Sequence, residues 1–161
     1  MGRAEIDYAS GFLGRLRGYP NARWPTWFDP TPVDLKPEPL GPFPQSRRLT
    51  QAGDVTLVPL PGHSPGHMGV LIDEGDHSVL LAGDTSHTED LLLRDVIDGV
   101  GPDEQGERIA QVSVRAYAAT HPTVYLVARA KRHLDEKQLD DVALGIAHID
   151  HVENSDARDG G

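Results

Sequence analysis

Two short segments of the sequence carry side chains that can bind a divalent metal. They are GHSPGH at 62–67 and GDTSH at 83–87, and each follows an apolar run typical of a strand. Imidazole and carboxylate groups together suit Zn²⁺ and other divalent first-row metals. A strand end aims a side chain well, and a neighbouring glycine lets the backbone approach an ion closely. We therefore predict that His63 and Asp84 bind metal, with His67 supporting the first loop from outside the ligand set.

Three strands must position these loops. Residues 54–60, 68–73 and 78–82 form apolar runs bounded by turn residues, and 74–77 is typical of a hairpin loop. All three runs are apolar on both faces, which predicts a sheet covered on both sides. A further strand is expected over 123–128.

Helices are predicted before and after these strands. The spacing indicates a helix over 4–17, although two glycines weaken it, and its inward residues would be Ile6, Phe12, Leu13 and Leu16. Thr88 would cap a helix over 88–98. A helix over 103–119 would carry one apolar face, made of Ile109, Val112, Ala116 and Ala119. A last helix over 133–147 would turn Leu139, Val142 and Ile146 inward.

The region between the first helix and the first strand is rich in proline. Eight prolines lie between Pro20 and Pro44, more than a helix or a central strand tolerates. The same region holds Trp24, Trp27, Phe28 and Phe43. A long loop over 20–50 that keeps its aromatic residues either packs against the body or lies over a binding site.

Composition narrows the class of protein. A chain of 161 residues predicts one domain, and alternating strands and helices predict an α/β or α+β layer protein. The net charge of −10 argues against nucleic acid and anionic membrane as partners. The absence of cysteine excludes a thiolate nucleophile and a Cys-based zinc site. Without an 18-residue apolar run or a signal peptide, a cytoplasmic location is expected.

The two segments with candidate metal ligands resemble motifs of a known family. PGHSPGH at 61–67, a hairpin, and LAGD at 81–84 are similar to the central motif pair of the metallo-β-lactamase superfamily. DTSHTE at 84–89 and GRLRGYPNARWP at 14–25 are similar to its quorum-quenching N-acyl homoserine lactonase branch. The resemblance runs over roughly residues 5–126. It implies an αββα sandwich, that is, a mixed sheet with helices on the outer faces.

The resemblance also implies a chemistry. His63 would be a metal ligand, and Asp84 would bridge two Zn²⁺ ions, with other divalent metals as alternatives. A metal-bound hydroxide would then hydrolyse a lactone or other ester-type bond of a small-molecule substrate. His87 falls where lactonase-like members often carry a tyrosine that contacts the substrate. It is therefore the candidate catalytic residue, and histidine at this position leaves the substrate class open.

One part of the family pattern is missing from its usual place. The superfamily carries an H-x-H-x-D-H motif on the N-terminal side of these residues, yet residues 1–62 contain no histidine. We therefore expect a single domain over 1–152 that is incomplete at its N-terminal side and followed by a disordered tail over 153–161.

A similar motif occurs near the other end of the chain. IAHIDH at 146–151 matches three of the four ligand positions, which makes His148, Asp150 and His151 candidate ligands displaced from front to back, as in a circular permutation. The alternative is a helix end with polar residues before the tail.

Three hypotheses for the function follow. The first is a lactonase-like metallohydrolase, completed by permutation or by a partner chain. The second is a truncated, inactive relative with a partial metal site, acting at most as a weak metal-binding or interaction module. The third keeps the superfamily but makes the substrate a thioester. A homodimer would be one way to cover an exposed sheet edge.

Overall fold

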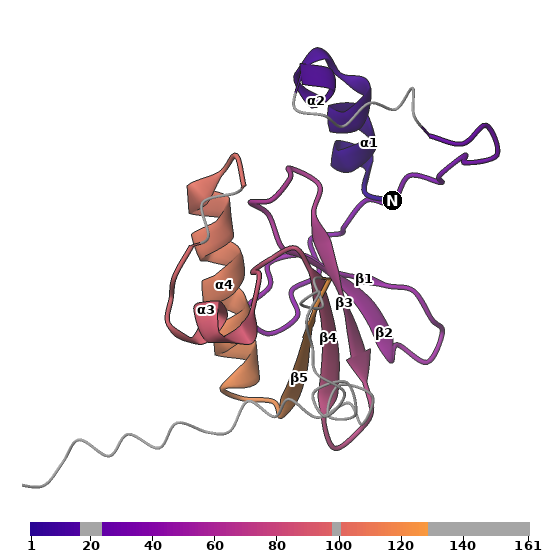
Figure 1. Cartoon of the computed structure of the whole chain (residues 1–161). Coiled ribbons are helices and arrows are strands. Elements are labelled where there is room, and N and C mark those ends of the chain that lie inside the picture. Colours follow the sequence, from indigo (N-terminus) through magenta and orange to yellow (C-terminus); the bar gives the residue numbers. More distant parts are fainter. Residues whose placement is uncertain (17–23, 98–100, 129–161) are drawn as a thin grey trace, which may run out of the picture.

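A computed structural model describes residues 1–16, 24–97 and 101–128 of the chain. These residues form one five-stranded sheet in the order β1-β2-β3-β4-β5 (Figure 1). Strands β1 (Arg47–Arg48), β2 (Val55–Pro59), β3 (Met68–Asp73) and β4 (Ser78–Gly83) are antiparallel neighbours. Strand β5 (Thr123–Val127) joins β4 in parallel, so the sheet is mixed.

The strands predicted from the sequence are confirmed to within one or two residues. The 68–73 strand has the predicted bounds, and 54–60, 78–82 and 123–128 correspond to β2, β4 and β5. The 74–77 hairpin loop is closed by a hydrogen bond from the backbone N–H of Glu74 to the carbonyl of His77. These runs are short, apolar and bounded by turn residues, which is why the pattern located them well.

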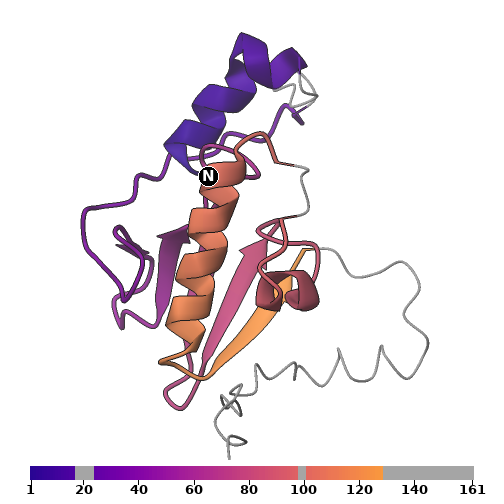
Figure 2. The ribbon, with the colours of Figure 1, turned by 90° about the vertical axis from the view of Figure 1, so that its left-hand side faces the viewer.

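Helices α3 (Glu89–Leu93) and α4 (Glu104–Ala118) pack on one face of the sheet (Figure 2). The Thr88 side chain accepts a hydrogen bond from the N–H of Leu91, which confirms the predicted cap. Helix α3 nevertheless ends at Leu93 rather than at 98. Asp103 caps α4 in the same way, by accepting from the N–H of Gly106. The core between the layers joins Leu80, Ala82 and Tyr125 of the sheet to Ala110 and Val114 of α4, with Phe43 and Leu92 also buried.

Helix α4 turns the predicted apolar face to solvent. Ile109 and Val112 are 52% and 54% exposed, and the buried face carries Gly106, Glu107, Ala110, Gln111, Val114 and Tyr117. The apolar spacing of Ile109, Val112, Ala116 and Ala119 therefore did not mark the face that packs on the sheet. Instead, Ala110, Val114 and Tyr117 pack into the hydrophobic core, and Gly106 lies against Gly62 of the loop before His63.

The expected helix over 4–17 is two helices, α1 (Arg3–Ser10) and α2 (Phe12–Leu16). Gly11 is extended and ends α1. The prediction that Phe12 and Leu16 turn inward is wrong, because they are 79% and 73% exposed, whereas Ala9 is buried. The break at Gly11 disrupts the continuous helical face on which that prediction depended.

The proline-rich region contains no strand or helix before β1 in the part that the structure describes. An isolated bridge from Gly2 to Val33 ties this region to the start of the chain, and a bridge from Lys36 to Ser46 joins two of its own residues. Of its aromatic residues, Phe43 is fully buried in the core, and Trp27 is largely exposed. The predicted packing of this loop against the body is therefore found at the end that contains Phe43.

The described sheet is covered by helices on one face only, and both helices lie on the same side of it (Figures 1 and 2). The expectation of helices on the outer faces is met on this side, so the fold is a mixed sheet with helices. The predicted helix over 133–147 and the tail over 153–161 lie outside the described residues. No helix among the described residues is both long and apolar enough to span a membrane.

Candidate metal centre

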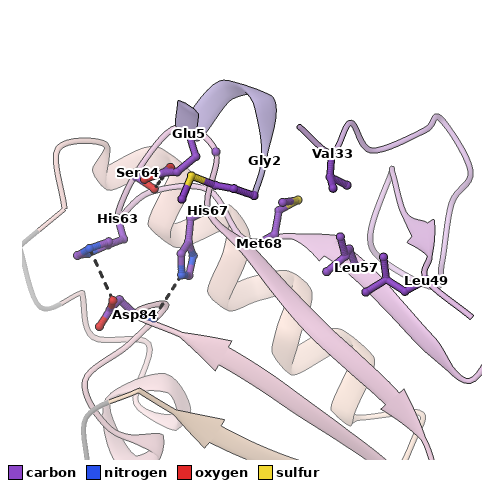
Figure 3. Close-up of a pocket in the computed structure, with 12 residues that line it drawn as sticks. Gly2, Glu5, Val33, Leu49, Leu57, His63, Ser64, His67, Met68 and Asp84 are labelled. Atoms are coloured by element: carbon purple, nitrogen blue, oxygen red, sulfur yellow. Dashed lines mark hydrogen bonds and ion pairs between the residues drawn. The ribbon is translucent and has the colours of Figure 1, made fainter. Parts of the chain in front are cut away.

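The sheet topology brings the two predicted loops to one end of the sheet. Strands β2, β3 and β4 alternate in direction, so the end of β2, the start of β3 and the end of β4 lie together. The loop over 60–67 and the segment that follows Gly83 are therefore neighbours. His63 Nε2 lies 3.8 Å from Asp84 Oδ2, and both side chains are partly exposed (Figure 3). That distance is too long for a direct hydrogen bond.

His67 links the two loops through backbone groups. Its Nδ1 lies 2.8 Å from the carbonyl oxygen of Leu60, and its Nε2 lies 3.3 Å from the backbone N of Asp84. A carbonyl can only accept and an amide N–H can only donate, so Nδ1 carries the proton and Nε2 accepts. Both ring nitrogens are engaged, and neither has a lone pair left for a metal in this arrangement.

Burial keeps the His67 ring neutral. It lowers the pKa of His67, and the nearby His63 lowers it further, against the opposing hydrogen bond to the Leu60 carbonyl. A neutral ring is the form that the two backbone contacts require, because a protonated Nε2 could not accept from the Asp84 N–H.

Gly83 makes this link geometrically feasible. Its φ is +58°, and a Cβ there would lie 2.7 Å from Nε2 of His67. A side chain at this position would therefore separate His67 from Asp84. The glycine just before the carboxylate both turns the backbone and leaves room for the imidazole.

Helix α4 braces the first loop at Gly62. This residue has φ +130°, and a Cβ there would collide with the backbone N and Cα of Glu107. The N-terminal turn of α4 thus packs directly on the residue before His63. Glu107 is buried at this contact.

Helix α1 holds the same loop from the other side. The Ser64 hydroxyl donates to Oε2 of Glu5 over 2.5 Å, and Ser64 is only 2% exposed (Figure 3). A hydrogen bond to a carboxylate is stronger than one between neutral groups. The residue after the candidate ligand His63 is therefore fixed by a helix 59 positions earlier in the chain.

A pocket of about 510 Å³ opens beside the two candidate ligands. His63, Asp84, Ser64 and Glu5 form its polar end, and its other end is apolar, with Val33, Leu49 and Leu57 beyond Met68 (Figure 3). The pocket can therefore receive a molecule that has a polar group at one end and an apolar body.

Other predicted site residues lie away from this group. His87 is half-buried, between β4 and α3, and is not among the residues that line the pocket. Its role as a substrate contact stays a prediction. His148, Asp150 and His151 lie outside the described residues, so their role as ligands also stays a prediction.

Glu5 and Ser64 are site residues that the sequence did not reveal. Ser64 stands inside the GHSPGH segment, but only the histidines and the turn-forming glycine and proline residues of that segment indicate a role. Nothing in the sequence around Glu5 marks it, because its partner is 59 positions away. The loop over 62–67 was found from its composition, but the groups that hold it in place were not.

The fit of a metal ion to the described residues is partial. One imidazole and one carboxylate face each other with an open pocket beside them. Within 1–16, 24–97 and 101–128, no group of three or more His, Cys, Asp or Glu side chains is arranged to hold a metal. Zinc sites generally use three or four protein ligands.

The chain matches the metallo-beta-lactamase superfamily model over residues 4–129. No curated protein sequence matches it. Among solved structures, an N-acyl homoserine lactone hydrolase with the product N-hexanoyl-L-homoserine at its catalytic metal centre is 24% identical. Its TM-score is 0.48, and the match covers 60% of this chain and 36% of that one.

Two other solved structures give similar values. An AiiA variant from B. thuringiensis with bound N-decanoyl-L-homoserine is 24% identical, with a TM-score of 0.48 and 60% and 36% of the two chains covered. A quorum-quenching N-acyl homoserine lactone lactonase is 25% identical, with a TM-score of 0.45 and coverage of 51% and 33%. The chain thus spans about a third of the length of these proteins.

A mixed sheet with histidine and aspartate at neighbouring strand ends defines an α/β protein with a candidate metal centre. The family match extends over most of the chain. The protein belongs to the metallo-beta-lactamase superfamily.

Proposed function

We propose that this protein is a metal-dependent hydrolase that acts on a lactone or other ester-type bond. The observation that carries the proposal is the convergence of His63 and Asp84, 3.8 Å apart, at the polar end of the pocket. Membership of the superfamily supports a divalent metal and hydrolytic chemistry. When bound, such an ion polarises the bond to be cleaved and activates water.

The residues of the chain would have distinct roles. His63 and Asp84 would hold the metal, and His67 would fix the Asp84 backbone without contacting the ion. The apolar wall of the pocket would bind an acyl or similar apolar group of the substrate. His148, Asp150 and His151 are the candidates for the remaining ligands, and His87 remains the candidate substrate contact.

Zinc uptake tests the proposal directly. The 161-residue chain is dialysed against Zn²⁺ and its metal content measured. We expect about two ions per chain, as for a complete two-metal site, and loss of uptake in His63→Ala and Asp84→Asn. Asp76 and His77 form a second Asp–His pair, 2.6 Å apart on the exposed hairpin loop, which makes Asp76→Asn and His77→Ala matched controls. No uptake by the parent, with His63→Ala leaving its thermal stability unchanged, would overturn the proposal.

The source of the remaining ligands has its own test. If the 146–151 segment supplies them, His151→Ala abolishes uptake as completely as Asp84→Ala. Equal uptake by His151→Ala and the parent rejects the displaced motif. The rate of acid release is then measured with an N-acyl homoserine lactone and with an acyl thioester. The substrate that is hydrolysed identifies the type of bond that is cleaved.

A second candidate is an inactive relative with a partial metal site. The observation that favours it is that the described residues contain no cluster of three His, Cys, Asp or Glu side chains that could hold a metal. Under this alternative, zinc binds weakly and neither the lactone nor the thioester is turned over. Metal content and turnover together therefore separate the two candidates.

A further inference from the structure

Helix α1 contacts the loop of His63 at a glycine, Gly66, as well as at Ser64. A Cβ at Gly66 would collide with the backbone N and Cα of Glu5. Gly66 is not among the glycines with positive φ, so its own backbone conformation does not require glycine. The requirement comes from the closeness of the helix, which packs on the loop at the position of Glu5.

The side chain of Glu5 makes the polar part of the same contact. Its carboxylate accepts the hydrogen bond from the buried Ser64 hydroxyl. Glu5 also lines the polar end of the pocket, together with His63 and Asp84 (Figure 3). The carboxylate therefore lies in the pocket of the two candidate ligands and is bonded to the residue that follows one of them.

The first turn of α1 is anchored independently of Glu5. Gly2 and Val33 form a parallel bridge, in which the N–H of Arg3 donates to the carbonyl of Val33. The Arg3 side chain forms an ion pair with Asp34. Val33 itself lines the apolar wall of the pocket, so the start of α1 is attached beside that wall. Glu5 thus reaches the loop from a backbone that has its own attachment.

His63 stands between two contacts with helices. Helix α4 packs on Gly62, the residue before it, and Glu5 of α1 binds Ser64, the residue after it. The backbone of His63 is therefore held on both sides, which leaves mainly the side-chain rotation to be fixed when an ion binds. A ligand that is held in place before binding loses less conformational freedom on binding.

We infer that Glu5 is a positioning residue for the candidate metal centre, and that it acts on His63 through Ser64 and Gly66. This role rests on the proposed function, because it requires that His63 binds a metal. Groups that orient a metal ligand from outside the ligand set typically raise the affinity of a site by roughly 10- to 100-fold. Loss of the Glu5 contact should therefore weaken metal binding although no ligand is removed.

The zinc affinity of the full 161-residue chain tests this role, with Zn²⁺ alone as the probe and a chromophoric chelator as the competitor. Glu5→Ala and Ser64→Ala should each bind zinc about 10-fold or more weakly than the parent. Glu5→Gln should keep most of the affinity, because its amide oxygen can still accept from Ser64. Asp7→Asn is the matched control, since Asp7 is an exposed carboxylate on the same helix that does not line the pocket. Parent-like affinity in Glu5→Ala, or an equal loss in Glu5→Gln and Glu5→Ala, overturns the inference.

A further variant disturbs the contact and leaves every polar group in place. A Cβ at Gly66 forces α1 away from the loop, so Gly66→Ala should weaken zinc binding about as much as Ser64→Ala does. Gly75→Ala adds the same methyl group on the hairpin loop, where it meets nothing within 4 Å, and should bind zinc like the parent. Unchanged affinity in Gly66→Ala contradicts the inference.

A measurement on the metal-free chain separates the role of Glu5 from the proposed function. In ¹⁵N-labelled protein, the imidazole signals of His63 should shift in Glu5→Ala and in Ser64→Ala. The signals of His77 and His121, which line a separate pocket at the other end of the sheet, should stay in place and show that the variants are folded. Unmoved His63 signals overturn the positioning role, even in a parent that binds zinc. A parent that takes up no zinc overturns the proposed function, and the His63 signals then still decide whether Glu5 positions this ring.

Discussion

The backbone N–H of Asp84 donates a hydrogen bond to Nε2 of His67, whose Nδ1 donates to the carbonyl of Leu60. One imidazole thus joins the end of β2 to the end of β4. The two contacts fix the tautomer and hold the loop of His63 against the backbone of Asp84.

Replacing His67 by alanine should destabilise the fold. The substitution removes the hydrogen-bond partner of the carbonyl of Leu60, a buried residue, and the partner of the Asp84 N–H. Each polar group left unsatisfied typically costs about 1–3 kcal/mol of stability. His67→Gln should recover part of the loss, because an amide can both donate and accept. Urea unfolding measures the free energy of unfolding of both variants. His77→Ala, on the exposed hairpin loop, is the control, and a stability of His67→Ala equal to that of this control would show that the link does not stabilise the fold.

Ser64 and Glu5 should be energetically coupled. Ser64→Ala removes the donor to a carboxylate, which typically costs about 1.5–3 kcal/mol. Glu5→Ala should add little once Ser64 is alanine, since both variants break the same bond. A double-mutant cycle from denaturant unfolding gives the coupling energy. The exposed ion pair between Arg3 of α1 and Asp34 provides a control cycle in which the coupling energy should be smaller, because exposed ion pairs are weak. Additive effects in the Ser64–Glu5 cycle would contradict the prediction.

Alanine at Gly62 should be far more harmful than alanine at Gly75. Both glycines have positive φ, +130° and +92°, but a Cβ at Gly62 meets the backbone of Glu107 and a Cβ at Gly75 meets nothing within 4 Å. The Gly75 variant should lose about 1–2 kcal/mol from backbone strain alone. Gly62→Ala should lose at least about 2 kcal/mol more, as is usual for overpacking at a rigid contact. Equal midpoints in thermal unfolding would mean that α4 does not brace the loop.

The pH dependence of stability should contain a component from Glu89. Burial raises the pKa of Glu89 in the folded protein, so the folded state is favoured when the carboxyl is protonated. This contribution is fully present below the unfolded pKa and is lost as pH rises through the higher folded pKa. Relative to Glu89→Gln, the parent should therefore lose stability across that window.

Asp34 provides a control of opposite sign for the same measurement. The hydrogen bond from Arg3 lowers the pKa of Asp34, so its contribution is present above the unfolded pKa and is lost as pH falls through the folded one. Relative to Asp34→Asn, the parent should gain stability as pH rises. Parallel curves for the parent and Glu89→Gln would contradict the prediction for Glu89.

The strands and the two loops that carry His63 and Asp84 could be predicted from the sequence, because the pattern that marks each one lies within a few consecutive residues. The run over 68–73 has a length, an apolar pattern and flanking turn residues that only a strand satisfies. His63 and Asp84 could be paired in advance because a hairpin between them returns the chain to the same end of the sheet.

The packing of the helices could not be predicted in the same way. Ile109 and Val112 have the spacing of a buried face, yet Ala110 and Val114 pack into the core, because the face that is buried depends on the shape of the surface it meets. Phe12 and Leu16 were misplaced for a related reason, since a single extended glycine redirects the second helix. Glu5 could not be found at all, because its role depends on a contact with a distant residue.

The strand order β1-β2-β3-β4-β5 has a consequence for how the site is assembled during folding. Every strand lies beside its neighbour in sequence, so His63 and Asp84 meet through two successive antiparallel pairings with short loops. Such contacts close small loops and form early, whereas the contact between Glu5 and Ser64 closes a long one. A folding intermediate that contains only β2, β3 and β4 would already place the histidine beside the aspartate. The contacts of α1 and α4 would then lock the loop in its final position.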